Sequence, residues 1–140
     1  YEPSINDAVA ELVLEYNMQD YVILACFILT TLSELRDSYP DFMTSFSFDE
    51  MMIFMGLTAE TEAEYEPPAQ FIHAPDEYSG IEVLTPEFIA RADNLELKVH
   101  AWTINSEQQM NDLIDLGVHG IMTDDVQLLE DVIEERGLNP

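Results

Sequence analysis

The chain has 140 residues, of which 47% are hydrophobic, and its 4 Lys+Arg against 29 Asp+Glu give a formal net charge of −25 at pH 7. This length and apolar content predict one folded core, a single domain or a piece of one, and exclude a disordered acidic tail. The scattered basic residues exclude nucleic-acid binding through counterion release, and the negative charge disfavours an anionic membrane surface.

Six positions carry the signals of a helix start. A Ser, Thr or Asp there can accept a hydrogen bond from a backbone N–H of the first turn. In two of them a Glu three residues later completes a capping box, and in another a proline occupies the first helical position. The six starts are Ser4, Thr31, Ser47, Thr85–Pro86, Ser106 and Asp124–Asp125. We therefore expect six helices, the first over residues 4–16 and the last over residues 127–135.

Five short apolar runs lie between these helix starts and predict strands. They cover residues 21–27, 42–46, 71–73, 97–104 and 118–122. Their nearly continuous hydrophobicity favours strands covered on both faces, and the helical segments between them require parallel pairing. The pattern predicts an α/β fold, which fits either an open doubly wound sheet or about half of a closed eight-stranded barrel. Because a helix comes first, we expect further sequence upstream.

Residues 58–68 interrupt this alternation, since they are rich in glutamate and end in two prolines. We interpret them as a solvated loop or a frayed helix end, in preference to a recognition segment.

The remaining composition gives little information on location. No apolar run reaches the roughly 18 residues of a membrane-spanning helix, and no signal peptide is expected at the start. Cys26 is the chain's one cysteine and has no basic neighbour, which favours an inert, buried thiol. A cation-rich medium, an acid-tolerant niche and simple solubility all fit the charge, so the localisation stays open.

The run at residues 97–105 carries the most specific pattern. The period of two places His100 and Trp102 on one side of the strand and Val99 and Ala101 on the other. The small and branched residues suit a helix-covered side, so in a barrel we expect His100 and Trp102 to point inward, with Trp102 near the carboxyl end. Trp102 is then either a core residue or a pocket wall. His100 fits a hydrogen-bonded interior residue better than a metal ligand or base.

The run at residues 117–125 predicts a helix end at Gly117, a strand, and then a helix capped by Asp124 or Asp125. Capping explains these two aspartates more simply than a cation site does. His73 and His119 are expected to be isolated, and no zinc-ligand spacing or glycine-rich phosphate loop occurs.

These two runs resemble motifs of the glycerophosphodiester phosphodiesterase family, whose barrels are related to those of phosphatidylinositol phospholipase C. Residues 99–105, VHAWTIN, are similar to the family's V-x-x-W-T-x-N strand, and residues 117–124, GVHGIMTD, are similar to its G-V-D-G-I-I-T-D strand. The resemblance implies a partial (β/α)8 TIM barrel, with residues 1–140 as the carboxyl-terminal half of the domain, about five parallel strands and six helices.

The chain departs from the family pattern at several places. Cys26 stands where the family has serine, His119 where it has aspartate, and Val126 near an expected proline. The family's His-Arg-Gly, E-x-D and E-x-K strands and its catalytic His-Asp pair have no counterpart here. The resemblance therefore implies that the catalytic histidines and the metal-binding carboxylates lie outside this chain.

The implied activity is metal-dependent hydrolysis of glycerophosphodiesters to glycerol 3-phosphate and an alcohol, a step of glycerol and lipid metabolism. By resemblance, Trp102, Phe27 and Asn105 belong to the substrate pocket, whereas no catalytic residue or metal ligand is expected in this chain. A divalent cation, Ca²⁺ or Mg²⁺, would be the cofactor of the complete enzyme. The expected partners are the small-molecule substrate and the missing amino-terminal half-barrel. A fused membrane segment outside this chain is compatible with the resemblance.

Two other interpretations stay open. The chain could be a non-catalytic acidic α/β binding module, or it could come from a related barrel of the phospholipase C or phospholipase D type.

Overall fold

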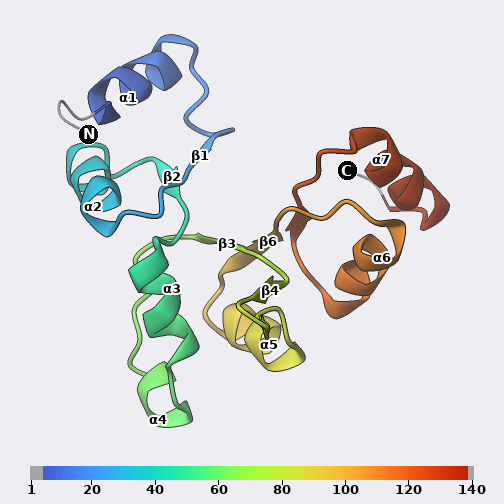
Figure 1. Cartoon of the computed structure of the whole chain (residues 1–140). Coiled ribbons are helices and arrows are strands. Elements are labelled where there is room, and N and C mark those ends of the chain that lie inside the picture. The colour runs from blue at the N-terminus through green and yellow to red at the C-terminus, as the bar shows by residue number, and fades with distance from the viewer. Residues whose placement is uncertain (1–4, 139–140) are drawn as a thin grey trace. The chain divides into compact units, whose positions relative to one another are not determined.

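The computed structural model describes residues 5–138, which form two compact units that meet in sequence between Ile72 and His73 (Figure 1).

The first unit alternates helices with short parallel strands. β1 pairs with β2 in the register Ile23↔Met43 and Leu24↔Thr44, and Ser45 forms a parallel bridge to Phe71, where β3 begins. In chain order the elements are α1 (Asn6–Glu15), β1 (Ile23–Leu24), α2 (Leu29–Ser38), β2 (Met43–Thr44), α3 (Phe48–Met55), α4 (Ala59–Glu62) and the start of β3 (Phe71–Ala74).

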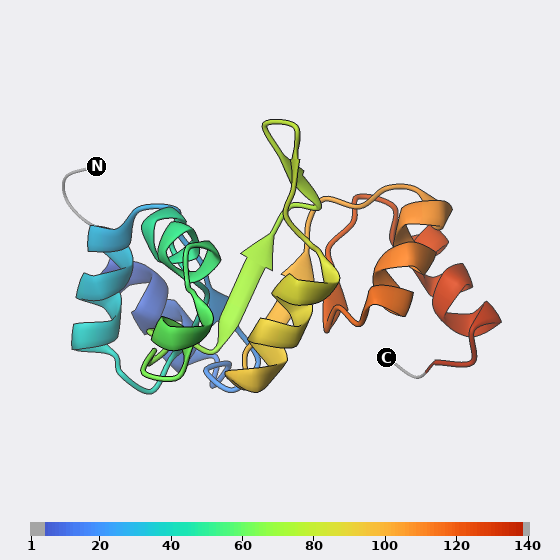
Figure 2. The same cartoon turned by 90° about the horizontal axis from the view of Figure 1, so that it is seen from below.

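The second unit contains a three-stranded sheet in the order β3-β6-β7, and β6 pairs with β7 in parallel. An antiparallel hairpin of β4 and β5 follows β3 and stands away from the other elements of the unit in Figure 2. The elements after β3 are β4 (Glu77–Tyr78), β5 (Ile81–Glu82), α5 (Pro86–Asn94), β6 (Lys98–Ala101), α6 (Glu107–Leu116), β7 (Gly120–Ile121) and α7 (Val126–Glu135).

The predicted α/β class is confirmed, and each of the five expected strands is present. Four are shorter than their apolar runs, whereas β3 extends one residue beyond its predicted end, to Ala74. The six expected helices are also present. Sequence reasoning missed the β4–β5 hairpin and the one-turn helix α4, which lies in the acidic segment at residues 58–68. Both are small elements with no hydrophobic period of their own to reveal them.

Side-chain caps occur at four of the six predicted helix starts. Ser47 and Glu50 form a complete capping box, and three further side chains accept a hydrogen bond from the third residue of their helix, namely Thr85, Ser106 and Asp125. Gly117 ends α6 with φ of +98°, as predicted. These local signals therefore fix the helix ends nearest to the predicted site.

The predicted cap at Thr31 is wrong. α2 begins earlier, at Leu29, with Ile28 as an N-cap residue that makes no side-chain hydrogen bond. Burial of Leu32 and Leu35 holds this helix in place, so it needs no polar cap. The expected cap at Ser4 lies outside the described residues, and Ile5 precedes α1.

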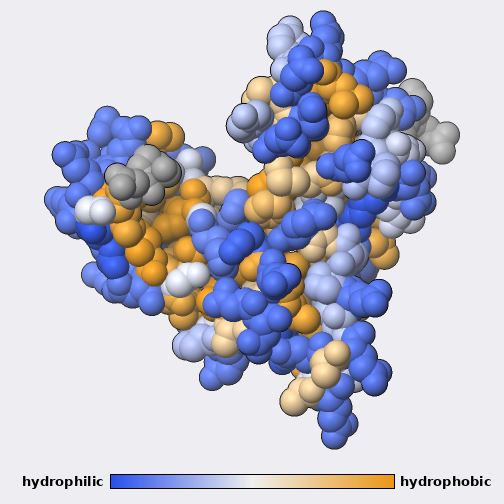
Figure 3. All heavy atoms as spheres, turned by 180° about the vertical axis from the view of Figure 1, so that it is seen from behind, coloured by the Kyte–Doolittle hydropathy of each residue, from blue (hydrophilic) through white to orange (hydrophobic). Residues whose placement is uncertain are grey.

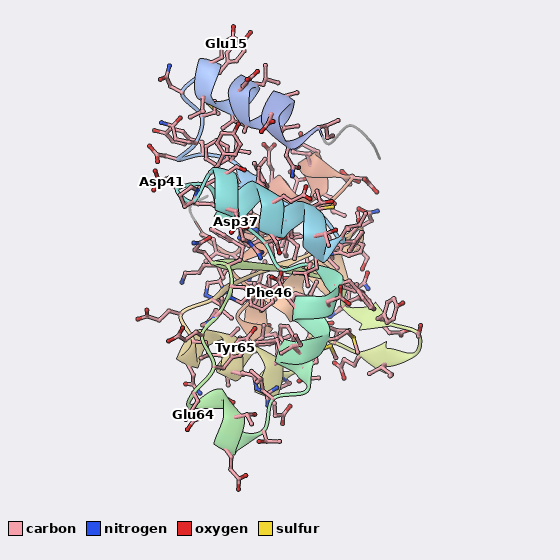
Figure 4. The ribbon with its side chains drawn as sticks, turned by 90° about the vertical axis from the view of Figure 1, so that its left-hand side faces the viewer. Glu15, Asp37, Asp41, Phe46, Glu64 and Tyr65 are labelled. Carbon is pink, nitrogen blue, oxygen red and sulfur yellow. The ribbon has the colours of Figure 1, made fainter. Side chains whose placement is uncertain are left out.

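The core of the first unit contains Ala10, Leu32, Leu35 and Phe42. Cys26 packs against this cluster but is only partly buried, less than predicted, and its Sγ accepts a hydrogen bond from Ile28 N at 3.4 Å. The ring of Phe54 in α3 contacts the rings of Phe46 and Tyr65, which lie along α3 in Figure 4.

Arg36 joins three elements of the first unit. Its guanidinium donates to Thr44 Oγ1 and Ser45 O of the β2 segment at 2.9 Å each, and to Glu50 Oε1 of α3 at 2.5 Å. Burial tends to raise the pKa of Glu50, but the hydrogen bonds from Arg36 and Ser47 outweigh it and lower that pKa. Glu50 is therefore a charged, buried partner.

Among residues 5–138, no helix is long and apolar enough to cross a membrane.

Candidate functional site

Trp102 follows β6 directly, at the carboxyl end of the strand. Its N–H donates to Ala74 O at 3.0 Å, which joins the ends of β6 and β3. Along the strand, Val99 and Ala101 are fully buried, whereas His100 and Trp102 are partly exposed. The predicted alternation therefore continues through Trp102, and its indole shares the more open face of the sheet with His100.

Asn105 connects the loops that follow β6 and β7. Its Nδ2 donates to Asp124 Oδ2 at 2.9 Å, while its Oδ1 accepts hydrogen bonds from Asp124 N at 2.9 Å and Thr123 Oγ1 at 3.0 Å. Thr123 Oγ1 in turn accepts from Asp125 N, and Asp125 caps α7. Both functional groups of the Asn105 amide are thus engaged in holding the two loops together.

Gln109, in the first turn of α6, ties this helix to the loop after β3. Its Nε2 donates to Asp76 Oδ2 at 2.8 Å. The loops after β3, β6 and β7 therefore meet at one edge of the sheet, the edge on which Trp102 lies.

Phe27 belongs to the first unit, in the loop between β1 and α2. Its side chain is 67% exposed, and its carbonyl oxygen accepts a hydrogen bond from Phe48 N at 3.0 Å. Trp102 and Asn105 belong to the second unit. The structure thus brings Asn105 together with the loop around Thr123, and it describes Phe27 only within its own unit.

All three histidines of the chain gather on the β3-β6-β7 sheet, so the prediction that His73 and His119 are isolated is wrong. The rings of His73 and His100 stack with centroids 5.2 Å apart and planes 14° from parallel. His119 Nδ1 accepts a hydrogen bond from Val99 N at 3.2 Å, and its Nε2 lies 3.5 Å from Asp93 Oδ1. Residues distant in sequence became neighbours because their strands pair.

Burial lowers the pKa of all three imidazoles. For His73, burial and the neighbouring His100 lower the pKa to about 4. Burial and His119 lower the pKa of His100; for His119, burial and Lys98 lower the pKa and Asp93 acts in the opposite direction. His73 Nε2 is buried and has no hydrogen-bond partner among residues 5–138. The His73–His100 pair is therefore uncharged at neutral pH.

The residues of this site do not fit a metal ion. In the part of the chain that the structure describes, no group of three or more His, Cys, Asp or Glu side chains converges so as to hold one. The two stacked imidazoles face each other through their ring planes, whereas metal coordination needs ring nitrogens that converge on one point.

Comparison with known proteins assigns the chain to a family. The model of the glycerophosphoryl diester phosphodiesterase family matches residues 1–128. A Mycobacterium tuberculosis protein named "Probable glycerophosphodiester phosphodiesterase 2" is 36% identical over 66 residues, which are 47% of this chain and 25% of that protein.

Two solved phosphodiesterase structures share the fold. A Silicibacter pomeroyi protein matches with a TM-score of 0.74 and 26% identity, over 96% of this chain and 45% of its own. An Oleispira antarctica phosphodiesterase, solved in complex with the product sn-glycerol-3-phosphate, matches in fold with a TM-score of 0.69 and 16% identity, over 92% of this chain and 49% of its own. The chain thus spans about half the length of these solved relatives.

Proposed function

Because the chain belongs to the glycerophosphoryl diester phosphodiesterase family, we propose that it forms part of an enzyme that hydrolyses glycerophosphodiesters to glycerol 3-phosphate and an alcohol. The family match over residues 1–128 is the observation that carries this proposal. The bound product named for the Oleispira antarctica relative supports the same reaction.

This chain supplies the carboxyl-terminal half of the barrel and is inactive on its own. Support comes from the solved relatives, of which it covers 45% and 49%. The family's catalytic histidine motif and carboxylate strands have no counterpart in the sequence. The acid–base groups and the ligands of a divalent cation, Ca²⁺ or Mg²⁺, therefore belong to sequence outside this chain.

Trp102 contributes an apolar wall to the substrate pocket in the second unit, and the assignment of Phe27 to a substrate pocket rests on the resemblance alone. An indole beside a glycerol or alcohol group offers a flat surface that excludes water, which strengthens the electrostatic interactions made by the catalytic groups. Neither side chain transfers a proton. Asn105 acts indirectly, because its three hydrogen bonds hold the loops after β6 and β7 in place.

The test is a kinetic comparison of variants of the complete protein, with glycerophosphocholine as substrate and release of glycerol 3-phosphate as the readout. Trp102→Ala should lower kcat/KM by about tenfold to a hundredfold, the range for loss of a large apolar contact. Tyr21→Ala serves as the control, because Tyr21 is an aromatic side chain that is 78% exposed in the first unit.

Three results would contradict the proposal. The first is a Trp102→Ala enzyme with the kcat/KM of the unaltered protein. The second is turnover of sphingomyelin or lysolipid without turnover of glycerophosphocholine, which would favour a related phospholipase-type barrel. The third is a complete protein that binds glycerophosphodiesters without cleaving them, which would favour the acidic binding module.

A further inference from the structure

The stacked rings of His73 and His100 belong to strands β3 and β6, just before the carboxyl end of the sheet where Trp102 lies. His73 precedes Ala74, whose carbonyl oxygen accepts the hydrogen bond from Trp102 N, and His100 precedes Trp102 by two residues on the more open face. The imidazole pair and the indole are thus consecutive side chains of one sheet surface.

A glycine makes room for this arrangement. Gly120 of β7 is the register partner of His100, and a Cβ atom built on Gly120 would lie only 2.8 Å from His100 Cδ2. The backbone of Gly120 does not have the positive φ that would itself require glycine. Glycine at this position therefore leaves space for the His100 ring, which lies between the β7 backbone and the His73 ring.

The pair is held by ring stacking and close packing more than by polar bonds of His73. The Nε2 atom of His73 is buried without a hydrogen-bond partner in the described part of the chain, a costly state for a polar atom. Histidine at position 73 therefore contributes to the sheet face mainly through its flat ring, stacked on His100.

From this geometry we infer that His73 and His100 are positioning residues, which support the Trp102 indole in the orientation needed for substrate binding. His100 precedes Trp102 by two residues on the more open face of the sheet, His73 stacks on the His100 ring, and Gly120 leaves space for that ring. The inference rests on the proposed function for its kinetic consequence, whereas the support of the indole is a property of the second unit alone.

Three substitutions separate these contributions. Gly120→Ala displaces the His100 ring without altering any aromatic side chain. His73→Ala removes the stacking partner, and His73→Phe keeps a ring at that position while replacing the unpaired nitrogen. Gly56→Ala is the matched control, because a Cβ atom on Gly56 would meet its nearest neighbour, Met52 O, at 3.4 Å, an ordinary contact.

The first measurement is the fluorescence emission of Trp102 at pH 7.5. Trp102 is the one tryptophan of this chain, and subtracting the spectrum of a Trp102→Phe variant removes emission from any other tryptophan of the complete protein. We expect a shifted emission maximum in Gly120→Ala and His73→Ala, and unchanged emission in His73→Phe and Gly56→Ala.

The second measurement is steady-state hydrolysis of glycerophosphocholine by the same variants. Gly120→Ala and His73→Ala should raise KM by about three- to tenfold, the range that corresponds to the loss of one aromatic pair, with kcat within about twofold. His73→Phe should restore the KM of the unaltered protein. A merely structural role would lower the amount of active protein, and hence the apparent kcat, and would leave KM unchanged.

The inference is overturned if Gly120→Ala and His73→Ala fold, as judged by circular dichroism, and keep both the emission and the KM of the unaltered protein. It is also overturned if His73→Phe behaves like His73→Ala, since the ring would then not be the feature that matters. Absence of hydrolysis in the unaltered complete protein would instead refute the proposed function, and the emission spectra would still decide whether the histidine pair supports Trp102.

Discussion

The imidazole rings of His73 and His100 prefer their uncharged form because they are partly buried and close to each other. The period of two in the sequence places His100 and Trp102 on one face of a strand, and the structure agrees with that placement. The stack with His73 could not be predicted, because the sequence does not tell which strand lies beside which. Predicting this stack would have required the pairing register of β3 and β6.

This preference predicts a stability that falls with acidification. The pKa of His73 is lowered to about 4 from its ordinary value of 6.5, so the unfolded chain binds the proton more tightly. The stabilisation is fully present above pH 6.5 and is lost as the pH falls from 6.5 toward 4. After discounting for partial exposure, His73 should account for about 1 kcal/mol of the stability lost between pH 7.5 and 5.5.

Urea unfolding of the complete protein at these two pH values measures this loss. His73→Phe should lose about 1 kcal/mol less than the unaltered protein, because the phenyl ring cannot take up a proton. The carboxylates are the same in both proteins, so their titration cancels in the comparison. An equal loss in both proteins would show that His73 is not protonated differently in the folded and unfolded states.

Helices α2 and α3 are joined by the largely buried ion pair between Arg36 and Glu50, whose side chains are 18% and 8% exposed. The sequence predicts the capping box that Glu50 forms with Ser47, since that signal is local. The partnership with Arg36, fourteen residues away, depends on how α2 and α3 pack and has no signal in the sequence. The hairpin β4–β5 was missed for a different reason, because it is a small local element with no hydrophobic period of its own.

Breaking this pair should be costly. Arg36→Met leaves the Glu50 carboxylate buried without its counter-charge, and we expect the free energy of unfolding of the complete protein to fall by about 2–4 kcal/mol. The control is Arg136→Met, which removes a more exposed pair with Asp115 and should cost at most about 1 kcal/mol. If urea unfolding shows equal losses of stability for the two substitutions, burial does not make the Arg36–Glu50 pair more important to stability than the exposed pair.

Large apolar side chains lie at the surface of both units. Figure 3 shows hydrophobic residues at the surface between hydrophilic ones, and large exposed side chains include Ile5, Leu12, Phe27, Ile53 and Ile81. The charged residues at the outside of the first unit include Glu15 and Glu64, labelled in Figure 4.

The family and the α/β class were predictable from two motifs and from the order of elements, because both are patterns along one strand or one helix.

The proposal of a half-barrel predicts the behaviour of the separate chain. Exposed apolar side chains and short strands favour association, so the 140-residue chain alone should sediment as dimers or larger species at micromolar concentration. Analytical ultracentrifugation measures this directly. A stable monomer with a cooperative melting transition would indicate that the chain needs no further half.

The most direct test of the account is the release of glycerol 3-phosphate from glycerophosphocholine, measured for the 140-residue chain alone and for the complete protein in the presence of Ca²⁺ or Mg²⁺. We predict product from the complete protein and none above background from the separate chain, because the catalytic and cation-binding groups are proposed to lie outside it. Turnover by the separate chain at a rate comparable to that of the complete protein would contradict the account, as would a complete protein that releases no glycerol 3-phosphate.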